Sequence, residues 1–599
     1  MFVRWRLVVG FSLVVVLGCG SRDDGAGSGD GSNDNSSDSS SDSSSDSSSD
    51  SSSDSSSDAA NPGCSVAAAA AAGEVATSRG LARGAAATGT WRFLGIPYAE
   101  PPVGARRFAE AEPRGCWDGP LVADDYGPVC PQVPATGKDK GKVIGAEDCL
   151  RLSVWTPTAA LGDVVGTGDG KKRPVWVFVH GGGNVQGSMS EAVPLGSKPI
   201  YDGARIAAEQ DAVVVTLNYR LGALGWLALP AAAKDAVKPG NAAISDLLVA
   251  LDWVQDEIAG FGGDPSRVLL FGESAGGVNV CALLATPAAK GRFTAAIIES
   301  GGCVQPAAAT VIAEHQAAID KGSCANQSSE AAMLTCLRGL PVDKVLTELP
   351  GGVGITTAGL GGDGTLRMGP IAGGAQLPKS PHAALGDGSA AQVPVVFGVN
   401  AEEQAGAFLI GVKDEAGLTA HINTVFLLLP KALREQLVAT YTKPGTFTDA
   451  GQAQEQLYAD MRFVCPARRY AKAAAAGGNK AVRRYYFAQR AKTKQGETPA
   501  RHGIELLYVF GTMSDIPLFT PHADDLALAA TMRTLWGQLA KGEQPAWDAG
   551  TDAQPQPWPL WTSADDALRL DTPIAVQQGV VSARCDIWDQ IYAATGWGQ

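Results

Sequence analysis

Residues Arg267-Val-Leu-Leu-Phe271 run directly into Gly272-Glu-Ser-Ala-Gly276, and apolar residues at helical spacing follow over residues 278–284. This order predicts a strand, a tight turn and a helix. Such a turn leaves no room for bulk two residues before and after the serine, and it lifts the Ser274 hydroxyl clear of the sheet. The following helix directs its first N–H groups toward any negative charge that develops there. Ser274 is therefore a candidate nucleophile.

Further strands and helices surround this unit. Residues 175–179 and 212–217 are short apolar stretches typical of buried strands, and residues 245–258 have helical spacing. The first stretch ends in His180-Gly-Gly-Gly183, whose glycines allow backbone N–H groups to approach a substrate carbonyl. A flexible turn would look the same in isolation, but upstream of a nucleophile turn it indicates an oxyanion loop. The alternation predicts an α/β fold with a large, mostly parallel central sheet flanked by helices.

In folds of this kind the acid and then the base follow the serine along the chain. Three of the six histidines leave room for an acid: His421, His502 and His522. His421 lies in an apolar helical stretch, which favours packing, and His522 opens a helix near the C-terminus. His502 lies in a loop before residues 506–510 and is the best candidate base.

The acid is expected where the next strand ends. Residues 393–397 form an apolar strand that leads into Gly398-Val-Asn-Ala-Glu402-Glu403. Catalytic residues of open α/β sheets collect at such strand ends. Spacing alone does not choose between Glu402 and Glu403, and a pair of surface glutamates is the plain alternative.

The composition is that of a folded, acidic chain. Of 599 residues, 45% are apolar and 18% are charged, which excludes chain-wide disorder, and length alone suggests about four domains. The net charge is −14, of which residues 19–60, with ten Asp and one Arg, contribute −9. The acidic balance argues against nucleic-acid binding.

The N-terminus has the features of an export signal. Arg4 and Arg6 precede an apolar run over residues 7–18 that is too short to span a bilayer, so residues 1–18 are predicted to be a signal peptide. The run ends in Val16-Leu-Gly-Cys19, which resembles the lipobox of bacterial lipoproteins. That resemblance implies that Cys19 is lipidated and that the exported protein is anchored to a membrane of a bacterial cell envelope. An ordinary secretory signal is the alternative.

A low-complexity segment separates this signal from the body. Residues 19–60 consist mainly of Ser, Asp, Gly and Asn, with a repeating Ser-Ser-Ser-Asp pattern, and cannot bury enough apolar surface to fold. About 40 residues of coil span roughly 35 Å. The pattern lacks the glycine turn and terminal glutamate of a calcium loop. We interpret it as a linker that holds the body, residues 61–599, away from a membrane.

Ten cysteines follow Cys19. An even number in an exported chain predicts disulfides, although the connectivity stays open, and free buried thiols are an alternative for Cys281 and Cys303. Neither a CxxC nor an HxxxH spacing occurs, so a metal site has little support.

The body resembles the type-B carboxylesterases, a family within the α/β-hydrolase fold that includes the cholinesterases. The resemblance runs roughly from residue 63 to the C-terminus. It is carried by FLGIPYAEPPVG (93–104), EDCL (147–150), NYRLG (218–222), FGGDP (261–265) and GESAGG (272–277). It implies one large catalytic domain in place of the four that length suggests, and no cofactor.

Residue roles follow from the same resemblance. It implies Ser274 as nucleophile, His502 as base and Glu403, rather than Glu402, as acid. Backbone N–H groups of three residues would form the oxyanion hole: Gly182, Gly183 and Ala275. Three disulfides are implied: Cys130–Cys149, Cys324–Cys336 and Cys465–Cys585. We further expect Cys64 to pair with Cys116.

The sequence departs from the family pattern at several positions. Gln404 follows the acid where glycine is usual, Gly302 stands where a serine is frequent, and Asn184 replaces a common aromatic residue, which predicts a more polar pocket. No tryptophan lies between Cys130 and Cys149, where cholinesterases hold the choline cation. A cholinesterase is therefore disfavoured.

The predicted function is that of a serine carboxylesterase, which hydrolyses small-molecule esters through an acyl-enzyme. Two alternatives stay open. One is a non-catalytic surface adhesion protein, which the linker would suit. The other is a lipase for longer acyl chains, although residues 353–366 are too rich in Gly and Thr to predict an apolar lid.

Overall fold

The computed structural model describes residues 64, 66, 68–69, 71–135, 137–162, 166–192, 198–229, 240–352, 366–406, 411–494, 496–517, 519–548 and 554–596. The predicted signal peptide (1–18), Cys19, the rest of the linker (to residue 60) and nearly all of residues 353–366 lie outside these ranges. Within them, no helix combines the length and apolar character needed to cross a bilayer.

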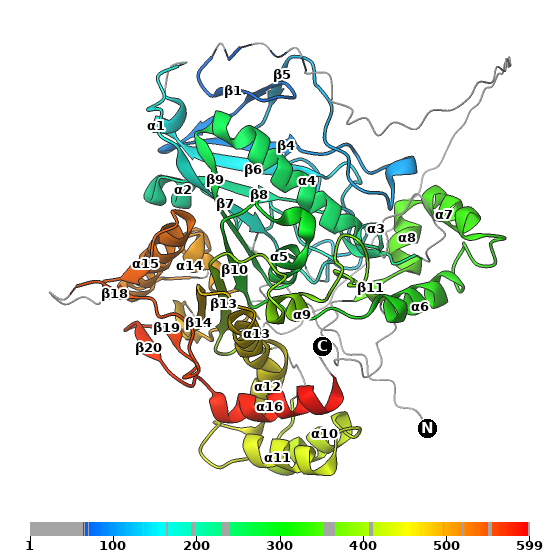
Figure 1. Cartoon of the computed structure of the whole chain (residues 1–599), viewed down its shortest axis with the longest axis vertical. Coiled ribbons are helices and arrows are strands. Elements are labelled where there is room, and N and C mark those ends of the chain that lie inside the picture. The colour runs from blue at the N-terminus through cyan, green and yellow to red at the C-terminus, as the bar shows by residue number, and fades with distance from the viewer. Residues whose placement is uncertain are drawn as a thin grey trace, which may run out of the picture.

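An eleven-stranded, twisted sheet forms the centre of the molecule (Figure 1). Its strands, in spatial order, are β20 (Ala575–Gln577), β19 (Ala567–Leu570), β14 (Val482–Phe487), β13 (Val395–Asn400), β10 (Ala295–Glu299), β9 (Gly263–Glu273), β7 (Arg173–Val179), β8 (Val213–Leu217), β6 (Arg151–Pro157), β4 (Thr90–Pro97) and β3 (Ala85–Ala87). The strands from β19 to β8 pair in parallel, and antiparallel strands occupy both edges. The predicted α/β fold with a mostly parallel sheet is confirmed.

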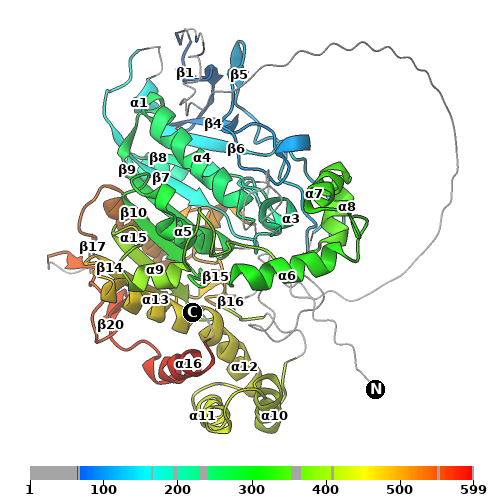
Figure 2. The same cartoon turned by 45° about the vertical axis from the view of Figure 1, so that its right-hand side comes forward.

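Helices cover both faces of this sheet and extend beyond its edges (Figures 1 and 2). They are α1 (Thr158–Leu161), α2 (Ala204–Gln210), α3 (Gly222–Trp226), α4 (Ala242–Glu257), α5 (Ala275–Ala285), α6 (Ala308–Ile319), α7 (Glu330–Gly339), α8 (Val342–Glu348), α9 (Pro381–Gly386), α10 (Glu415–Val425), α11 (Lys431–Tyr441), α12 (Ala450–Ala459), α13 (Cys465–Ala476), α14 (Leu506–Val509), α15 (Ala523–Ala540) and α16 (Ser582–Thr595). A π-helical turn, η4 (Asp460–Val464), joins α12 to α13.

Short elements complete the described chain. Small sheets are formed by β1 (Glu74–Ala76), β2 (Leu81–Arg83) and β5 (Pro120–Val122), by β11 (Gly351–Gly352) and β12 (Leu366–Arg367), by β15 (Ala491–Thr493) and β16 (Gly496–Thr498), and by β17 (Ala546–Trp547) and β18 (Gln556–Pro557). Short 3₁₀ turns are η1 (Gly104–Arg106), η2 (Ile258–Phe261), η3 (Pro287–Ala289) and η5 (Met513–Asp515).

Two hydrophobic cores lie on opposite faces of the sheet, as β7 illustrates. Val175, Val177 and Val179 belong to one core, which includes residues of α4, α5 and α13. Trp176 and Phe178 belong to the other, which includes residues of α2, α14 and α15. Successive side chains of a strand point to opposite faces, so a strand covered on both sides reads as a continuous apolar run.

Five disulfides join the ten cysteines of the body. The three pairs that the resemblance implied are present: Cys130–Cys149, Cys324–Cys336 and Cys465–Cys585. The expected pair Cys64–Cys116 is present as well. Cys281 and Cys303 also form a disulfide, so the alternative of free buried thiols was wrong for these two. Their Cα atoms, 22 residues apart in sequence, lie 5.4 Å apart because β10 returns the chain beside α5.

Candidate active site

Ser274 occupies a strained turn between β9 and α5. Its backbone has φ 57° and ψ −122°, an unusual conformation for a residue with a side chain, and its N–H donates to the Glu299 carbonyl at 2.8 Å. A Cβ atom on Gly276 would lie 2.0 Å from the Val179 carbonyl oxygen, which only glycine avoids. The predicted turn is therefore present, and Ser274 borders a cavity above the sheet.

The triple-glycine loop lies beside this turn. The His180 ring stacks on Tyr219 with centroids 4.5 Å apart, and the Tyr219 hydroxyl donates to the His180 carbonyl at 2.8 Å. Burial lowers the pKa of His180 to about 4, so the ring is neutral at physiological pH. The N–H groups of Gly182, Gly183 and Ala275 donate to no acceptor within the described residues. These three donors are free to bind a ligand oxygen.

His502 and Glu403 meet through a short hydrogen bond. His502 Nδ1 lies 2.7 Å from Glu403 Oε2, and Glu403 is buried. The other carboxylate oxygen, Oε1, accepts from the Ser300 hydroxyl at 2.6 Å and from the Asn400 N–H at 2.8 Å. Three donors therefore hold this carboxylate in place, and the carboxylate in turn fixes the imidazole with its proton on Nδ1.

The neighbouring glutamate is engaged elsewhere. Glu402 forms an ion pair with Arg490, with Arg490 Nε 3.0 Å from Glu402 Oε2, and accepts from the Ala500 N–H at 3.1 Å. Of the two glutamates that spacing left open, the structure places Glu403 against His502 and Glu402 against Arg490.

A second carboxylate faces the other imidazole nitrogen. His502 Nε2 lies 3.1 Å from Glu273 Oε1, and the Phe463 ring packs against the imidazole with centroids 4.7 Å apart. Burial alone would lower the pKa of His502, but Glu273 and Glu403 raise it to about 9. Burial raises the pKa of Glu273 to about 7, opposed by the charge of His502. The titrations of His502 and Glu273 are therefore linked through this close approach.

The other two candidate histidines have structural roles. His421 Nε2 lies 2.9 Å from the Tyr458 hydroxyl within the α10–α12 region. His522 caps the N-terminus of α15, and its backbone N–H donates to Asp525 Oδ2 at 3.0 Å. The sequence prediction that favoured His502 over both is consistent with these positions.

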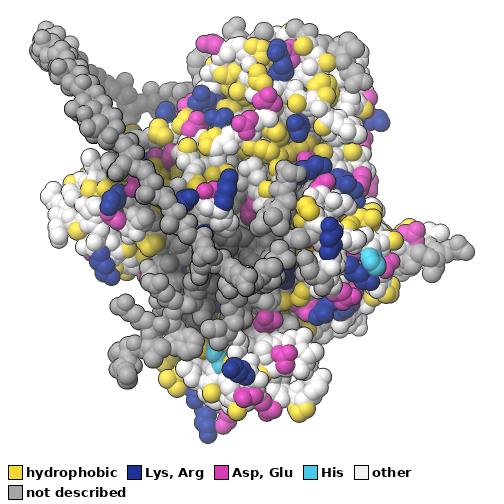
Figure 3. Space-filling model, turned by 180° about the vertical axis from the view of Figure 1, so that it is seen from behind, with side chains coloured by type: hydrophobic (Ala, Val, Ile, Leu, Met, Phe, Trp, Pro, Cys, Tyr) yellow, Lys and Arg dark blue, Asp and Glu magenta, His cyan; other side chains and the backbone are white. Residues whose placement is uncertain are grey.

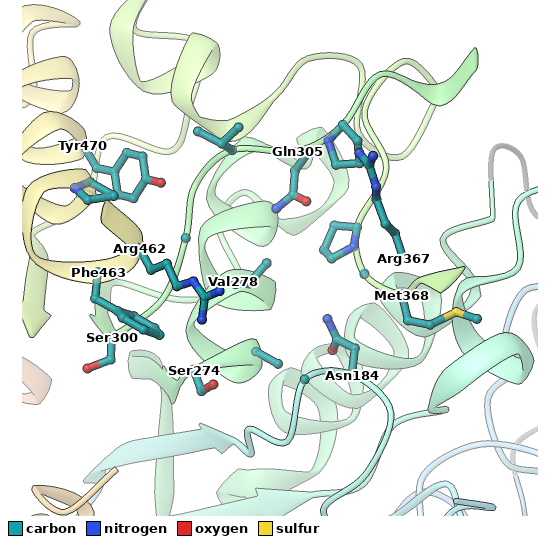
Figure 4. Close-up of a pocket in the computed structure, with 18 of the residues that line it drawn as sticks. Asn184, Ser274, Val278, Ser300, Gln305, Arg367, Met368, Arg462, Phe463 and Tyr470 are labelled. Atoms are coloured by element: carbon teal, nitrogen blue, oxygen red, sulfur yellow. The ribbon is translucent and has the colours of Figure 1, made fainter. Parts of the chain in front are cut away.

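The cavity in front of Ser274 has a volume of about 400 Å³, within the usual range for small-molecule sites. Figure 4 shows Ser274 and Asn184 on its lower side, Gln305 above them, and Arg462 reaching in from η4. Asn184 Oδ1 accepts from Asn279 Nδ2 at 2.9 Å. Asn184 lines the cavity, so the predicted polar residue is present next to the glycine loop.

Sequence reasoning missed four residues that surround this centre: Ser300, Glu273, Glu505 and Arg462. Ser300 follows β10 at the sheet edge where Glu403 follows β13, so the strand-end rule could have identified it. Asn400 Nδ2 donates to Glu505 Oε2, and burial and neighbouring carboxylates raise the pKa of Glu505. No sequence pattern indicated that the side chain of Arg462 would face the cavity.

The side chains and N–H groups around Ser274 form a set with a recognisable chemistry. Among the described residues, no cluster of three His, Cys, Asp or Glu side chains is arranged to hold a metal ion. The set comprises a hydroxyl on a strained turn, an imidazole with an orienting carboxylate, and N–H groups without acceptors. Such a combination suits attack on a carbonyl carbon.

Comparisons with known proteins agree with this geometry. Residues 71–588 match the model of the carboxylesterase family. The para-nitrobenzyl esterase of Bacillus subtilis (strain 168) is 32% identical over 514 residues, which cover 83% of this chain and 94% of the relative. The medium-chain fatty acyl-CoA hydrolase precursor of Anas platyrhynchos is 31% identical over 533 residues, covering 83% and 87%. A solved thermophilic PNB esterase matches with a TM-score of 0.69 and 30% identity, over 86% of this chain and 100% of its own.

Proposed function

This chain belongs to the carboxylesterase family and is a carboxylic-ester hydrolase, and we propose that it acts as a serine esterase through Ser274, His502 and Glu403. The observation that carries the proposal is the 2.7 Å contact between His502 Nδ1 and Glu403 Oε2. It supports an imidazole oriented to serve the serine of the strained turn. The family match spans residues 71–588, and the fold is that of a single large domain.

The proposed reaction begins with proton transfer. His502 Nε2 takes the proton of Ser274 as the serine oxygen attacks the ester carbonyl carbon, and the carbonyl π electrons move onto oxygen. The N–H groups of Gly182, Gly183 and Ala275 stabilise this oxyanion. When the carbonyl re-forms, the bond to the alcohol oxygen breaks, and the alcohol leaves with the proton from His502.

The second half repeats these steps with water. His502 removes a proton from a water molecule, whose oxygen attacks the acyl carbon. The bond to the Ser274 oxygen then breaks, His502 returns the proton to that oxygen, and the carboxylic acid leaves. Glu403 keeps the imidazole in one tautomer and stabilises its charged form in both halves. Glu273 lies next to Nε2, so its protonation state sets how readily His502 becomes a neutral base.

Purified full-length protein in detergent tests the proposal. We expect turnover of p-nitrophenyl esters, and we expect Ser274→Ala to lower kcat/KM by about 10⁴-fold or more with an unchanged melting temperature. A series from acetate to palmitate separates an esterase from a lipase, because a lipase would prefer the long acyl chains. Turnover retained in Ser274→Ala would refute the nucleophile. If the wild-type protein hydrolyses none of these esters, a non-catalytic binding protein would be favoured.

We also propose that the protein is exported and anchored through lipidated Cys19. The support is the run Val16-Leu-Gly-Cys19 after an apolar segment, and the acidic linker over residues 19–60. A Cys19→Ser variant should move from the membrane fraction to the soluble fraction of a bacterial host. Unchanged partition would refute the anchor, and the fraction in which the wild-type protein sediments identifies the membrane that holds it.

A further inference from the structure

The lining of the cavity carries positive charge and no negative charge. Three arginines contribute to it, Arg367, Arg462 and Arg469, whereas none of its described lining residues is Asp or Glu. On the face of the molecule seen in Figure 3, acidic and basic side chains are interspersed over the described surface. The exclusively positive charge of the cavity lining is therefore a local feature of this site.

Arg462 lines this cavity and has no acidic partner among the described residues. Its guanidinium lies over the Tyr458 ring at 5.2 Å, and Nη1 donates to Gln404 Oε1 over a long 3.4 Å. Burial lowers the pKa of Arg462 to about 10, with partial compensation from Tyr458, so the side chain is charged at physiological pH. A half-buried charge without a counter-ion is costly for the folded protein.

Arg367 differs from Arg462 in this respect, whereas Arg469, like Arg462, lies over a tyrosine ring. Arg367 Nη2 forms an ion pair with Glu314 Oε1 at 2.9 Å, outside the cavity lining. Arg469 stacks its guanidinium over the Tyr592 ring at 5.0 Å. Elsewhere in the described chain, buried Arg220 pairs with Asp246 at 2.6 Å, an example of a buried guanidinium whose charge a carboxylate compensates.

Gln305 supplies a second donor to the same cavity. The residue is 6% exposed, and its Nε2 atom is buried without a hydrogen-bond partner among the described residues. Figure 4 shows the Gln305 amide directed into the cavity. A buried donor without an acceptor costs about 1–3 kcal/mol, so it too points to an acceptor that arrives with a ligand.

We propose that the cavity binds esters that carry a carboxylate a few bonds from the scissile carbonyl, with Arg462 and Gln305 holding that carboxylate. This proposal rests on the proposed esterase function. The substrates would be half-esters of dicarboxylic acids or esters of hydroxy acids. The same lining disfavours cationic substrates. The planar guanidinium of Arg462 offers a carboxylate two parallel donors, and because Arg462 is half-buried such a pair is stronger than on a fully exposed surface.

Matched ester pairs test this class with a built-in reference. For a carboxylate on the acyl side, mono-4-nitrophenyl adipate is compared with its neutral methyl ester. For a carboxylate on the alcohol side, 4-acetoxybenzoate is compared with methyl 4-acetoxybenzoate. Each kcat/KM is divided by the rate of uncatalysed hydrolysis, and the anionic-to-neutral ratio is the readout. The ratio cancels any change in overall activity.

Wild-type protein should show a ratio well above one in one of the two pairs, and that pair identifies the side on which the carboxylate lies. Arg462→Met, which keeps the apolar stem, should lower this ratio by about 10- to 100-fold. Arg462→Lys keeps the positive charge but lacks the two parallel N–H donors of the guanidinium, and it should give an intermediate ratio. Lys472→Gln removes a positive charge from an exposed position on α13 and should leave the ratio unchanged.

Inhibition of the wild-type protein covers the case in which an Arg462 variant does not fold. With 4-nitrophenyl acetate as the reporter substrate, adipate should inhibit competitively, and its dimethyl ester should bind at least 10-fold more weakly as a competitor. The difference should shrink at high salt.

The outcomes separate the inference from the function on which it rests. Turnover of neutral esters with ratios near one in both pairs, or a ratio that Arg462→Met leaves unchanged, would overturn the substrate class and leave the esterase intact. Equal inhibition by adipate and its dimethyl ester would do the same. Absence of turnover with every ester would overturn the proposed function, and the inference with it.

Discussion

His502 lies between two regions of the protein that differ in charge and in packing. Four glutamates are buried around the imidazole: Glu273, Glu299, Glu403 and Glu505. Three of them accept hydrogen bonds. The Ser300 hydroxyl donates to Glu403, Trp536 Nε1 donates to Glu299 at 2.8 Å, and Asn400 Nδ2 donates to Glu505. In front of Ser274, the cavity lacks any described carboxylate and contains arginine. In our proposal the buried glutamates fix the geometry of the reaction, whereas the basic cavity selects the substrate.

Removing the orienting carboxylate should produce the largest effect on the first region. Glu403→Gln replaces the acceptor of His502 Nδ1 and should lower kcat by about 10²- to 10⁴-fold, because the imidazole loses its tautomer and the partner of its positive charge. Glu402→Gln is the matched control, since Glu402 pairs with Arg490. Steady-state kinetics on one neutral ester checks both. A larger loss in Glu402→Gln would place the acid one residue earlier.

A disulfide lies next to the cavity in front of Ser274. The disulfide Cys281–Cys303 ties α5 to the segment that contributes Gly302, Val304 and Gln305 to the cavity. Replacing both cysteines with alanine should lower the free energy of unfolding by about 3 kcal/mol, as expected for a closed loop of this length. It should also raise KM more than it lowers kcat.

Urea denaturation and kinetics measure these two effects. The disulfide Cys324–Cys336 provides the control. It closes a loop of 12 residues and contributes no residue to the cavity lining. Replacing both of its cysteines with alanine should change stability without changing KM. Equal KM values in both double variants would show that the cavity wall holds its shape without the disulfide.

The smallest effect that we expect is a shift in the pH dependence of activity when Glu273 is replaced. Glu273 raises the pKa of His502, so Glu273→Gln should lower it and increase the fraction of neutral base at pH 7. The rising limb of kcat/KM against pH should therefore move to lower pH. A limb that stays in place, or that moves to higher pH, would separate Glu273 from the titration of the base. Glu402→Gln should leave the limb unchanged.

The sequence predicted the first region far better than the second. Ser274 and the pair Glu402–Glu403 follow strands of a parallel sheet, and His502 precedes a short helix, so motif and topology pointed to these positions. The choice between Glu402 and Glu403 needed the resemblance, because adjacent residues in a turn point in directions that spacing does not specify. The resemblance likewise implied three disulfides, but Cys281–Cys303 required the fold that returns β10 beside α5.

The cavity lining could not be read from the sequence because its parts are distant along the chain. Arg462 belongs to a π-helical turn, and the extra residue in such a turn changes which side chains face inward. Gln305 follows the strand end at Ser300 by five residues and enters the cavity through a loop. The substitution of Asn184 for an aromatic residue was the single local sign of a polar cavity, and it was visible only against the family pattern.

Trapping the acyl-enzyme tests the central proposal most directly. Wild-type protein is mixed with excess p-nitrophenyl butyrate, quenched in acid within the first turnover, digested and analysed by mass spectrometry. We expect a burst of nitrophenol and the added mass of one butyryl group on the peptide that contains Ser274, with His502→Ala showing neither. Nitrophenol release without acylation of Ser274, or acylation of another residue, would contradict the proposed mechanism.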